Sequence, residues 1–260
     1  MDRGLHVQWS GGTQIARRPR VSAPDASERV HESADLSSID PRLLIWLSPS
    51  FPVGAFAYSH GLELAVERGW VHDRETLTLW LTDLIELGSL RNDLIVLAHC
   101  WRAAIAEDVR ELLRTNELAI ALQPSSERRL ETLTQGRAFL STLCAAWPTE
   151  KLATLAGKLA GEVAYPVAVG TGTAAHDMSL AGVLQPFAMS FVTNLISAAI
   201  RLSVVGQTDG QRVVAALMRA MAVESRKAAD ATLDDLGSAT LRSDLASLAH
   251  EMQYSRLFRS

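Results

Sequence analysis

The chain has 260 residues, of which 48% are hydrophobic and only 6% aromatic, so it carries enough apolar side chain for a sizeable core of closely packed helices. A net charge of -4 at pH 7 argues against nucleic-acid binding, which requires a basic surface. The first ten residues lack the apolar region of a secretory signal. Two cysteines outside any motif fit a reducing compartment, and we therefore expect a cytoplasmic protein.

Residues 1–38 mix glycine, proline, serine and arginine with scattered acids and show no sustained periodicity. This composition predicts a disordered N-terminal leader. Helical pattern begins at Asp40, a predicted N-cap, with Pro41 in the first helical position. We therefore expect an all-helical domain over residues 39–260.

The next segment, residues 47–63 (LSPSFPVGAFAYSHGLE), is rich in proline and glycine, yet it carries several aromatic side chains. Loops are normally polar, because their exposed backbone must remain solvated. An aromatic loop is therefore expected either to pack under the core or to be covered by another molecule.

Five further helices are predicted from polar caps that precede apolar side chains spaced three or four residues apart. The predicted caps, in chain order, are Asp73, Asn92 or Asp93, Ser125, Thr149 and Asp209. No segment alternates between polar and apolar residues, so neither a hairpin nor a sheet is expected. The predicted fold class is all-α: a single globular, bundle-like domain of about ten helices.

Three patterns concern the middle of the chain. Gly157 and Gly161 have the spacing that lets two helix backbones approach closely, whereas Gly170 and Gly172 are interpreted as a kink that breaks a helix. The 23 residues from 178 to 200 carry no charge and are long enough to span a bilayer. Their many hydroxyl and amide side chains favour instead a buried helix of a soluble bundle, and no membrane contact is expected.

The last residues, 254–260 (YSRLFRS), combine aromatic and apolar side chains with two arginines. These types are enriched at the energetic centres of protein interfaces, so the segment is expected mostly to bind a partner. Before it, Leu245, Leu248, Ala249 and Met252 continue one helical face, which we expect to pack mostly on the core.

No catalytic or phosphate-binding motif is found, and the chain is predicted not to be an enzyme. Ser59 and His60 are adjacent, but the third member of a nucleophilic triad is missing. The phosphate loop GxxxxGK[ST] is absent. The seven histidines form no His-rich tract, so no metal site or cofactor is predicted. A transient ligand role for one imidazole stays open.

Five segments resemble the UreF family of urease accessory proteins. They are FPVGAFAYSHGLE at 51–63, NELAIALQPSSERRLETLTQGRAFL at 116–140, YPVAVGTGTAAHDM at 165–178, NLISAAIRLSVVGQTDGQR at 194–212 and YSRLFRS at 254–260. Their order and their spread over residues 42–260 argue against chance similarity. One departure is that Ala55 and Ala57 stand where Gly and Ser are common in the family.

The resemblance implies a non-enzymatic helical scaffold that forms a homodimer. Such a protein bridges UreD or UreH to the nickel-carrying GTPase UreG, so that nickel reaches apo-urease. Two alternatives stay open: a regulator of the UreG GTPase rate, and a direct nickel metallochaperone. The aromatic loop and the C-terminal residues are implied to dock partners, above all through Tyr58 and Arg256. The full predicted set of partner-binding residues is Phe51, Pro52, Gly54, Phe56, Tyr58, His60, Tyr254, Arg256, Leu257, Phe258 and Arg259.

Overall fold

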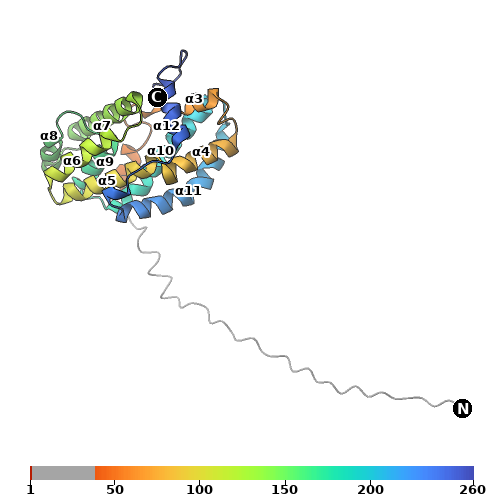
Figure 1. The fold of residues 1–260 in the computed structure, drawn as a ribbon. Coiled ribbons are helices and arrows are strands. Elements are labelled where there is room, and N and C mark those ends of the chain that lie inside the picture. The colour runs from red at the N-terminus through yellow and green to blue at the C-terminus, as the bar shows by residue number, and fades with distance from the viewer. Residues whose placement is uncertain (2–38) are drawn as a thin grey trace. The chain divides into compact units, whose positions relative to one another are not determined.

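The computed structural model describes Met1 and residues 39–260, so the leader predicted over residues 1–38 lies, apart from Met1, outside the described residues. Residues 39–260 form eleven α-helices and two short 3-10 helices without any strand, which confirms the predicted all-α fold (Figure 1). The helices are α2 (Pro41–Trp46), η1 (Ala55–Ala57), α3 (Leu62–Glu67), α4 (Arg74–Leu87), α5 (Ser89–Ile105), α6 (Val109–Ala121), α7 (Ser126–Ala146), α8 (Glu150–Lys158), α9 (Tyr165–Ala174), α10 (Leu180–Arg201), α11 (Gln207–Asp230), η2 (Leu233–Asp235) and α12 (Leu241–His250).

Four predicted helix starts are confirmed. Side-chain oxygens of Asp40, Asp73, Ser125 and Thr149 accept hydrogen bonds from backbone N–H groups in the first turns of α2, α4, α7 and α8. The first N–H groups of a helix have no acceptor within it, and these side chains satisfy one of them. Capping is a local interaction, and the sequence pattern is therefore sufficient to locate it.

Two predicted starts are wrong. Helix α5 begins at Ser89 rather than behind Asn92 or Asp93, and α11 begins at Gln207 rather than behind Asp209. Both helices follow a glycine that offers no capping side chain. Asp209 lies instead within the first turn of α11, where an acid is also favourable, whereas Asn92 and Asp93 lie further inside α5.

Helix α9 lies against α5, α6, α7 and α8, and every residue from 166 to 174 is buried. The predicted break at Gly170 and Gly172 is wrong, because both lie inside the continuous helix. A Cβ at Gly170 would lie 2.6 Å from the carbonyl oxygen of Leu97 in α5. One at Gly172 would lie 2.6 Å from a methyl group of Leu143 in α7. The two glycines therefore let α9 pack directly on its neighbours.

The close helix approach predicted at Gly157 and Gly161 is also wrong. No atom lies within 4 Å of the Cβ position of either residue. A glycine that does allow close backbone approach is Gly136 in α7, where a Cβ would overlap the backbone carbonyl of Val163. Glycines thus occur here both in packed and in open positions, and only the fold distinguishes the two.

Helix α10 is long and apolar enough to cross a bilayer by length and composition, and it is the one such helix in the described part of the chain. Half of its most apolar window is buried within the protein, and the helix packs on α11 and α5. One buried face is typical of a core helix, and the length test alone is weak evidence for a membrane span.

We expect Gly170→Ala to lower the free energy of unfolding by about 2 kcal/mol, because α9 and α5 leave no space for the new methyl group. Gly157→Ala is the matched control. With open space around its Cβ position, the higher helix propensity of alanine should raise stability by up to about 1 kcal/mol. Urea unfolding followed by circular dichroism measures both variants, and equal midpoints would contradict the close packing of α9.

Candidate functional site

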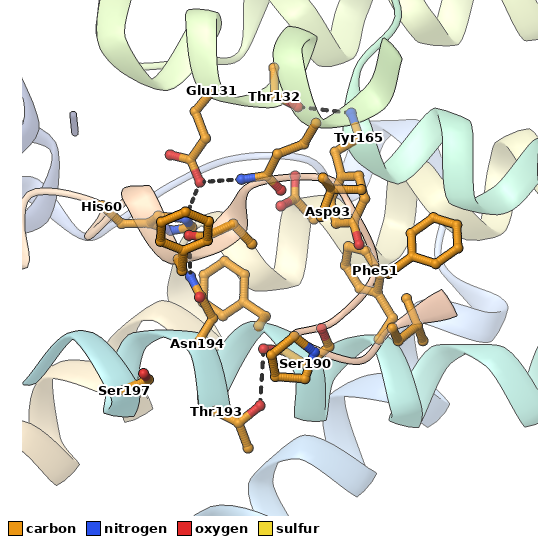
Figure 2. Close-up of a pocket in the computed structure, with 18 of the residues that line it drawn as sticks. Phe51, His60, Asp93, Glu131, Thr132, Tyr165, Ser190, Thr193, Asn194 and Ser197 are labelled. Carbon is orange, nitrogen blue, oxygen red and sulfur yellow. Dashed lines mark hydrogen bonds and ion pairs between the residues drawn. The ribbon is translucent and has the colours of Figure 1, made fainter. Parts of the chain in front are cut away.

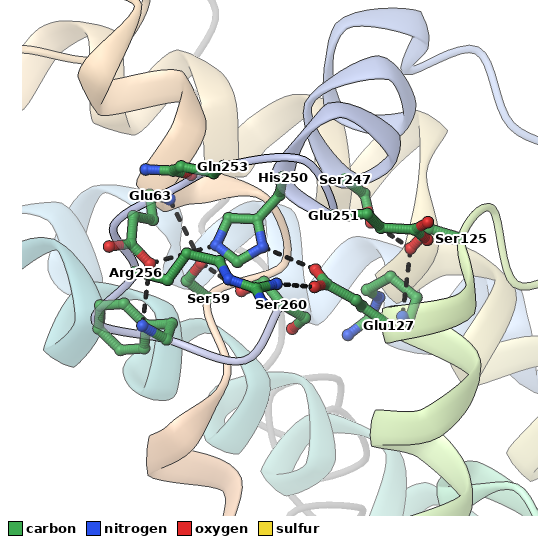
Figure 3. Close-up of polar contacts among 12 residues, drawn as sticks. Ser59, Glu63, Ser125, Glu127, Ser247, His250, Glu251, Gln253, Arg256 and Ser260 are labelled. Atoms are coloured by element: carbon green, nitrogen blue, oxygen red, sulfur yellow. Dashed lines mark hydrogen bonds and ion pairs between the residues drawn. The ribbon is translucent and has the colours of Figure 1, made fainter.

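The tail, residues 254–260, packs against the aromatic loop, residues 47–63, although 201 positions separate Ser59 from Ser260. The N–H of Ser59 donates to the main-chain oxygen of Ser260 over 2.7 Å, and the N–H of Arg259 donates to the carbonyl of Ala57 over 2.8 Å. The two segments that the sequence singled out therefore lie side by side in the folded chain (Figure 3).

Glu63 in α3 fixes the path of the tail. Its buried carboxylate accepts hydrogen bonds from the N–H groups of Leu257, over 2.6 Å, and Phe258, over 2.9 Å. A third donor, Nε2 of His250 at the end of α12, lies 3.2 Å away. A buried carboxylate without donors costs several kcal/mol. These three contacts therefore make the docked tail the stable arrangement.

Gly61 allows α12 to approach α3 closely enough for these contacts. Its φ of 76° lies in the left-handed region, which glycine adopts without strain. A Cβ on Gly61 would also lie 2.8 Å from the backbone nitrogen of Ser247 in α12. Any side chain at this position would therefore strain the loop and push α12 away from α3.

His250 joins α12 to both α3 and α7. Its ring is fully buried, with Nδ1 2.6 Å from Glu127 and Nε2 3.2 Å from Glu63. Both nitrogens face a carboxylate, and both can donate only when the imidazole is protonated. Arg256 in the tail also pairs with Glu127. His250 and Arg256 thus contact the carboxylates of Glu63 and Glu127 at the junction of α12, the tail and the loop (Figure 3).

A second buried carboxylate, that of Glu131 in α7, also contacts both segments. It accepts from Nε2 of His60 over 2.7 Å and from Oγ of Ser260 over 2.9 Å, and it pairs with Arg128. Burial alone would raise the pKa of Glu131, but Arg128 and then His60 outweigh burial and lower it to about 2. Glu131 is therefore an ionised acceptor at physiological pH.

His60 is neutral at physiological pH, because burial and, next, the positive charge of Arg128 lower its pKa. A neutral imidazole has a single N–H, and the contact with ionised Glu131 assigns that hydrogen to Nε2. Nδ1 is then an acceptor, and it is buried without a partner among residues 39–260.

The predicted partner-binding residues fall into two groups. Gly54 is partly exposed, and the exposed members are Pro52, Phe56, Tyr254, Arg256, Leu257 and Arg259. The buried members are Phe51, Tyr58, His60 and Phe258. The exposed side chains are available to another molecule, whereas the buried side chains hold the loop and the tail in place.

Three buried aromatic residues illustrate this positioning role. Tyr58 is only 2% exposed, so its ring has almost no surface for the direct partner contact that was expected. The ring of Phe51 packs on Phe139 in α7, with centroids 5.3 Å apart. The ring of Phe258 lies under the guanidinium of Arg201 in α10, 4.3 Å from its centroid. Such a cation–π contact contributes about 0.5–1 kcal/mol near the surface.

The apolar face of α12 points outward, which makes the expected packing of Leu245, Leu248, Ala249 and Met252 on the core wrong. Ala246 and Ser247 are buried instead. The close approach of α12 to α3 at Gly61 explains the inversion, because only small side chains fit between the two helices. Together with the tail, the outward residues form what we call the α12 apolar row: Leu241, Leu245, Leu248, Met252, Tyr254 and Leu257.

Beside the aromatic loop lies a cavity of about 140 Å³ between the loop, α5, α7, α9 and α10 (Figure 2). Asp93 of α5 lines it together with His60, and burial raises the pKa of Asp93 to about 7. Among the residues that the structure describes, no group of three or more His, Cys, Asp or Glu side chains is arranged to hold a metal ion.

The sequence reasoning missed Glu63, Glu127, Glu131 and His250. One available signal was the spacing of Glu127 and Glu131, which places both carboxylates on one face of a helix. Nothing in the sequence, however, shows that this face is buried or that some of its donors, such as Ser260, come from more than a hundred residues away. These four side chains became recognisable only through the packing of α12 on α3 and α7.

These features define an all-helical protein with an anchored C-terminal tail beside an exposed apolar row. A model of the UreF family matches residues 71–218. The urease accessory protein UreF of Methylobacterium radiotolerans is 54% identical over 219 residues, which cover 84% of this chain and 96% of the relative. The UreF proteins of Xanthobacter autotrophicus and of Rhodopseudomonas palustris strain BisA53 are each 52% identical, covering 93% and 91% of this chain and 99% of each relative. The chain therefore belongs to the UreF family of urease accessory proteins.

We expect Glu63→Ala to release the tail while the helical bundle stays folded, because three donors lose their acceptor at once. Hydrogen exchange should show faster exchange of the amides of residues 257–259 and of Ser59. Glu75→Ala, which alters an exposed ion pair on α4, is the control and should leave these amides protected. Unchanged protection in Glu63→Ala would show that the carboxylate does not hold the tail.

Asp93→Asn should stabilise the protein at pH 8. The pKa of Asp93 is raised from 3.8 to about 7, so the folded state binds more protons than the unfolded state and stability falls as pH rises through this window. The shift from 3.8 to about 7 corresponds to about 4 kcal/mol of folding stability lost at pH 8. Because solvent can reach the cavity, we expect a gain of about 2 kcal/mol. Urea midpoints should converge near pH 4. A gain at pH 8 that persisted at pH 4 would exclude the carboxylate charge as its cause.

Proposed function

We propose that this protein is a non-enzymatic scaffold in urease maturation that bridges UreD or UreH to the GTPase UreG, so that nickel reaches apo-urease. Membership of the UreF family gives the process, and the α12 apolar row is the observation that supports a scaffold. Large exposed apolar patches are uncommon on monomeric soluble proteins and mark interaction surfaces.

The α12 apolar row is suited to binding because its largest side chains are exposed yet held in order. Met252 is 87% exposed, and Tyr254 is fully exposed. The backbone beneath them is anchored through Glu63 and His250. A surface that is already ordered loses less conformational entropy when a partner binds, and this favours affinity.

Arg256 and the exposed loop residues extend the proposed surface. The side chain of Arg256 is 39% exposed while it pairs with Glu127, so its guanidinium is already oriented. Arginine and tyrosine are the side chains most often found at the energetic centres of interfaces. We assign the direct contacts to Phe56, Tyr254, Arg256 and Leu257, and a positioning role to Tyr58.

We further propose that the protein is a cytoplasmic homodimer. Support for the dimer comes from the family resemblance, and support for the compartment comes from the cysteines. Cys100 is buried and Cys144 half-buried, and neither forms a disulfide. Free thiols are typical of reducing compartments.

We expect the double variant Met252→Ser and Tyr254→Ala to weaken capture of UreD or UreH, of UreG, or of both by about thirtyfold. This corresponds to the loss of about 2 kcal/mol of binding from an interface centre. The thermal midpoint should change little, because neither side chain is buried. Pull-downs with each purified partner, with and without GTP, measure the effect.

Leu113→Ser in α6 is the matched control, since it also removes an exposed apolar side chain but lies outside the α12 apolar row. It should leave partner capture unchanged. If the double variant captures both partners as well as the unaltered protein does, the α12 apolar row is not their docking surface.

A further inference from the structure

The cavity beside the aromatic loop has the size of a small ligand. Its volume is about 140 Å³. An engineered cavity of about 150 Å³ in another protein binds benzene, so the space accommodates about six non-hydrogen atoms. Its walls come from the aromatic loop and from four helices, and its lining includes the exposed residues Phe56, Thr193 and Ser197. The cavity is therefore reachable from the surface.

Several acceptors around the cavity lack a donor within residues 39–260. Asp93 makes no hydrogen bond to any described residue, and Nδ1 of the buried His60 has no partner among them. The amide groups of Gln135 and Asn194 donate to Glu131 and to the carbonyl of Ala55, over 2.9 Å and 3.1 Å. Their amide oxygens have no hydrogen-bond donor in the described chain. A ligand that satisfies this lining must supply several N–H or O–H donors.

The charge of the lining is negative when Asp93 is ionised. Arg128 and Glu131 neutralise each other through their ion pair. His60 is neutral and Tyr165 remains protonated, because burial lowers the pKa of the first and raises the pKa of the second. Asp93 thus carries the single uncompensated charge, and it faces Arg128, Glu131 and Tyr165 across the cavity.

Aromatic rings complete the lining. Phe51 and Tyr165 line the cavity (Figure 2), and so do Phe56, Phe187 and Phe191. The faces of aromatic rings attract cations by about 0.5 to 2 kcal/mol, and sites for organic ammonium groups use such rings. An anion would meet Asp93 without a free cation to receive it.

From this arrangement we propose that the cavity is a binding site for a small organic cation with several N–H donors, of the alkylammonium or guanidinium class. The cationic group donates to Asp93 and to Nδ1 of His60, while its carbon atoms contact the phenylalanine rings. The source is either a free small molecule or the end of a lysine or arginine side chain. This site is separate from the α12 apolar row, and its test does not require any maturation partner.

Binding should strengthen as pH rises through about 7. Asp93 is mostly protonated at pH 6 and mostly ionised at pH 8, because its pKa is raised to about 7. An alkylammonium ion keeps its charge over this range, since such amines have pKa values near 10. The dissociation constant should therefore fall about tenfold between pH 6 and pH 8.

The test titrates the full-length protein with n-butylammonium and with methylguanidinium while NMR records the imidazole signal of His60. We expect a dissociation constant of about 1 mM or below, a plausible strength for about five non-hydrogen atoms. Asp93→Asn should weaken binding at least tenfold. Asp83→Asn, which removes the same charge from an exposed residue of α4, should leave binding unchanged. Tetramethylammonium, which has no N–H, should bind at least tenfold more weakly than n-butylammonium.

The proposal would be overturned if n-butanol or tetramethylammonium bound as strongly as n-butylammonium, or if Asp93→Asn bound n-butylammonium as strongly as the unaltered protein. It would also be overturned if the His60 signal did not shift at a ligand concentration 20 times the expected dissociation constant. A further titration uses N-acetyl-arginine methylamide and N-acetyl-lysine methylamide. Binding as strong as that of the free fragments identifies a protein side chain as the source. Exclusion of these blocked amino acids, with the fragments still bound, identifies a free small molecule. Because both probes are small, failure of this test leaves the scaffold function intact.

Discussion

The arrangement of α12 and the tail depends on one requirement: the buried carboxylate of Glu63 must be supplied with donors. Two of them are backbone N–H groups of the tail, and the third is the imidazole of His250. An uncompensated buried carboxylate costs several kcal/mol, a large fraction of the net stability of a protein of this size. The carboxylate therefore determines where α12 ends and which way the following residues run.

The same requirement explains why α12 exposes its apolar side chains. To bring His250 to Glu63, the helix must lie close to α3, and the contact at Gly61 leaves space only for small residues. The larger apolar side chains then face solvent. In an isolated protein such exposure is unfavourable. Burial of these side chains against another molecule would be favourable. The polar interior of the junction and the apolar exterior of α12 are thus two consequences of one packing geometry.

The sequence was informative where the determining interaction is local. Caps such as Asp73 and Thr149 act within one turn, and four of them were located correctly. Gly170 and the outward face of α12 were misjudged because their meaning depends on helices distant in sequence. The aromatic loop and the tail were recognised as unusual from composition, but their mutual contact was not. Hydrogen bonds between positions 201 residues apart leave no periodic pattern to detect.

His60 connects the tail with the cavity, because its two ring nitrogens have different surroundings. Nε2 donates to Glu131, which also accepts from Ser260 in the tail, while Nδ1 is unpartnered in the described chain. The backbone of His60 has a φ of 56°, a conformation that costs a residue with a side chain about 1 kcal/mol. The contact with Glu131 offsets this strain. A ligand group that donates to Nδ1 would bind the same imidazole that contacts Glu131, the carboxylate that accepts from Ser260. Any coupling between ligand binding in the cavity and docking of the tail must be reciprocal.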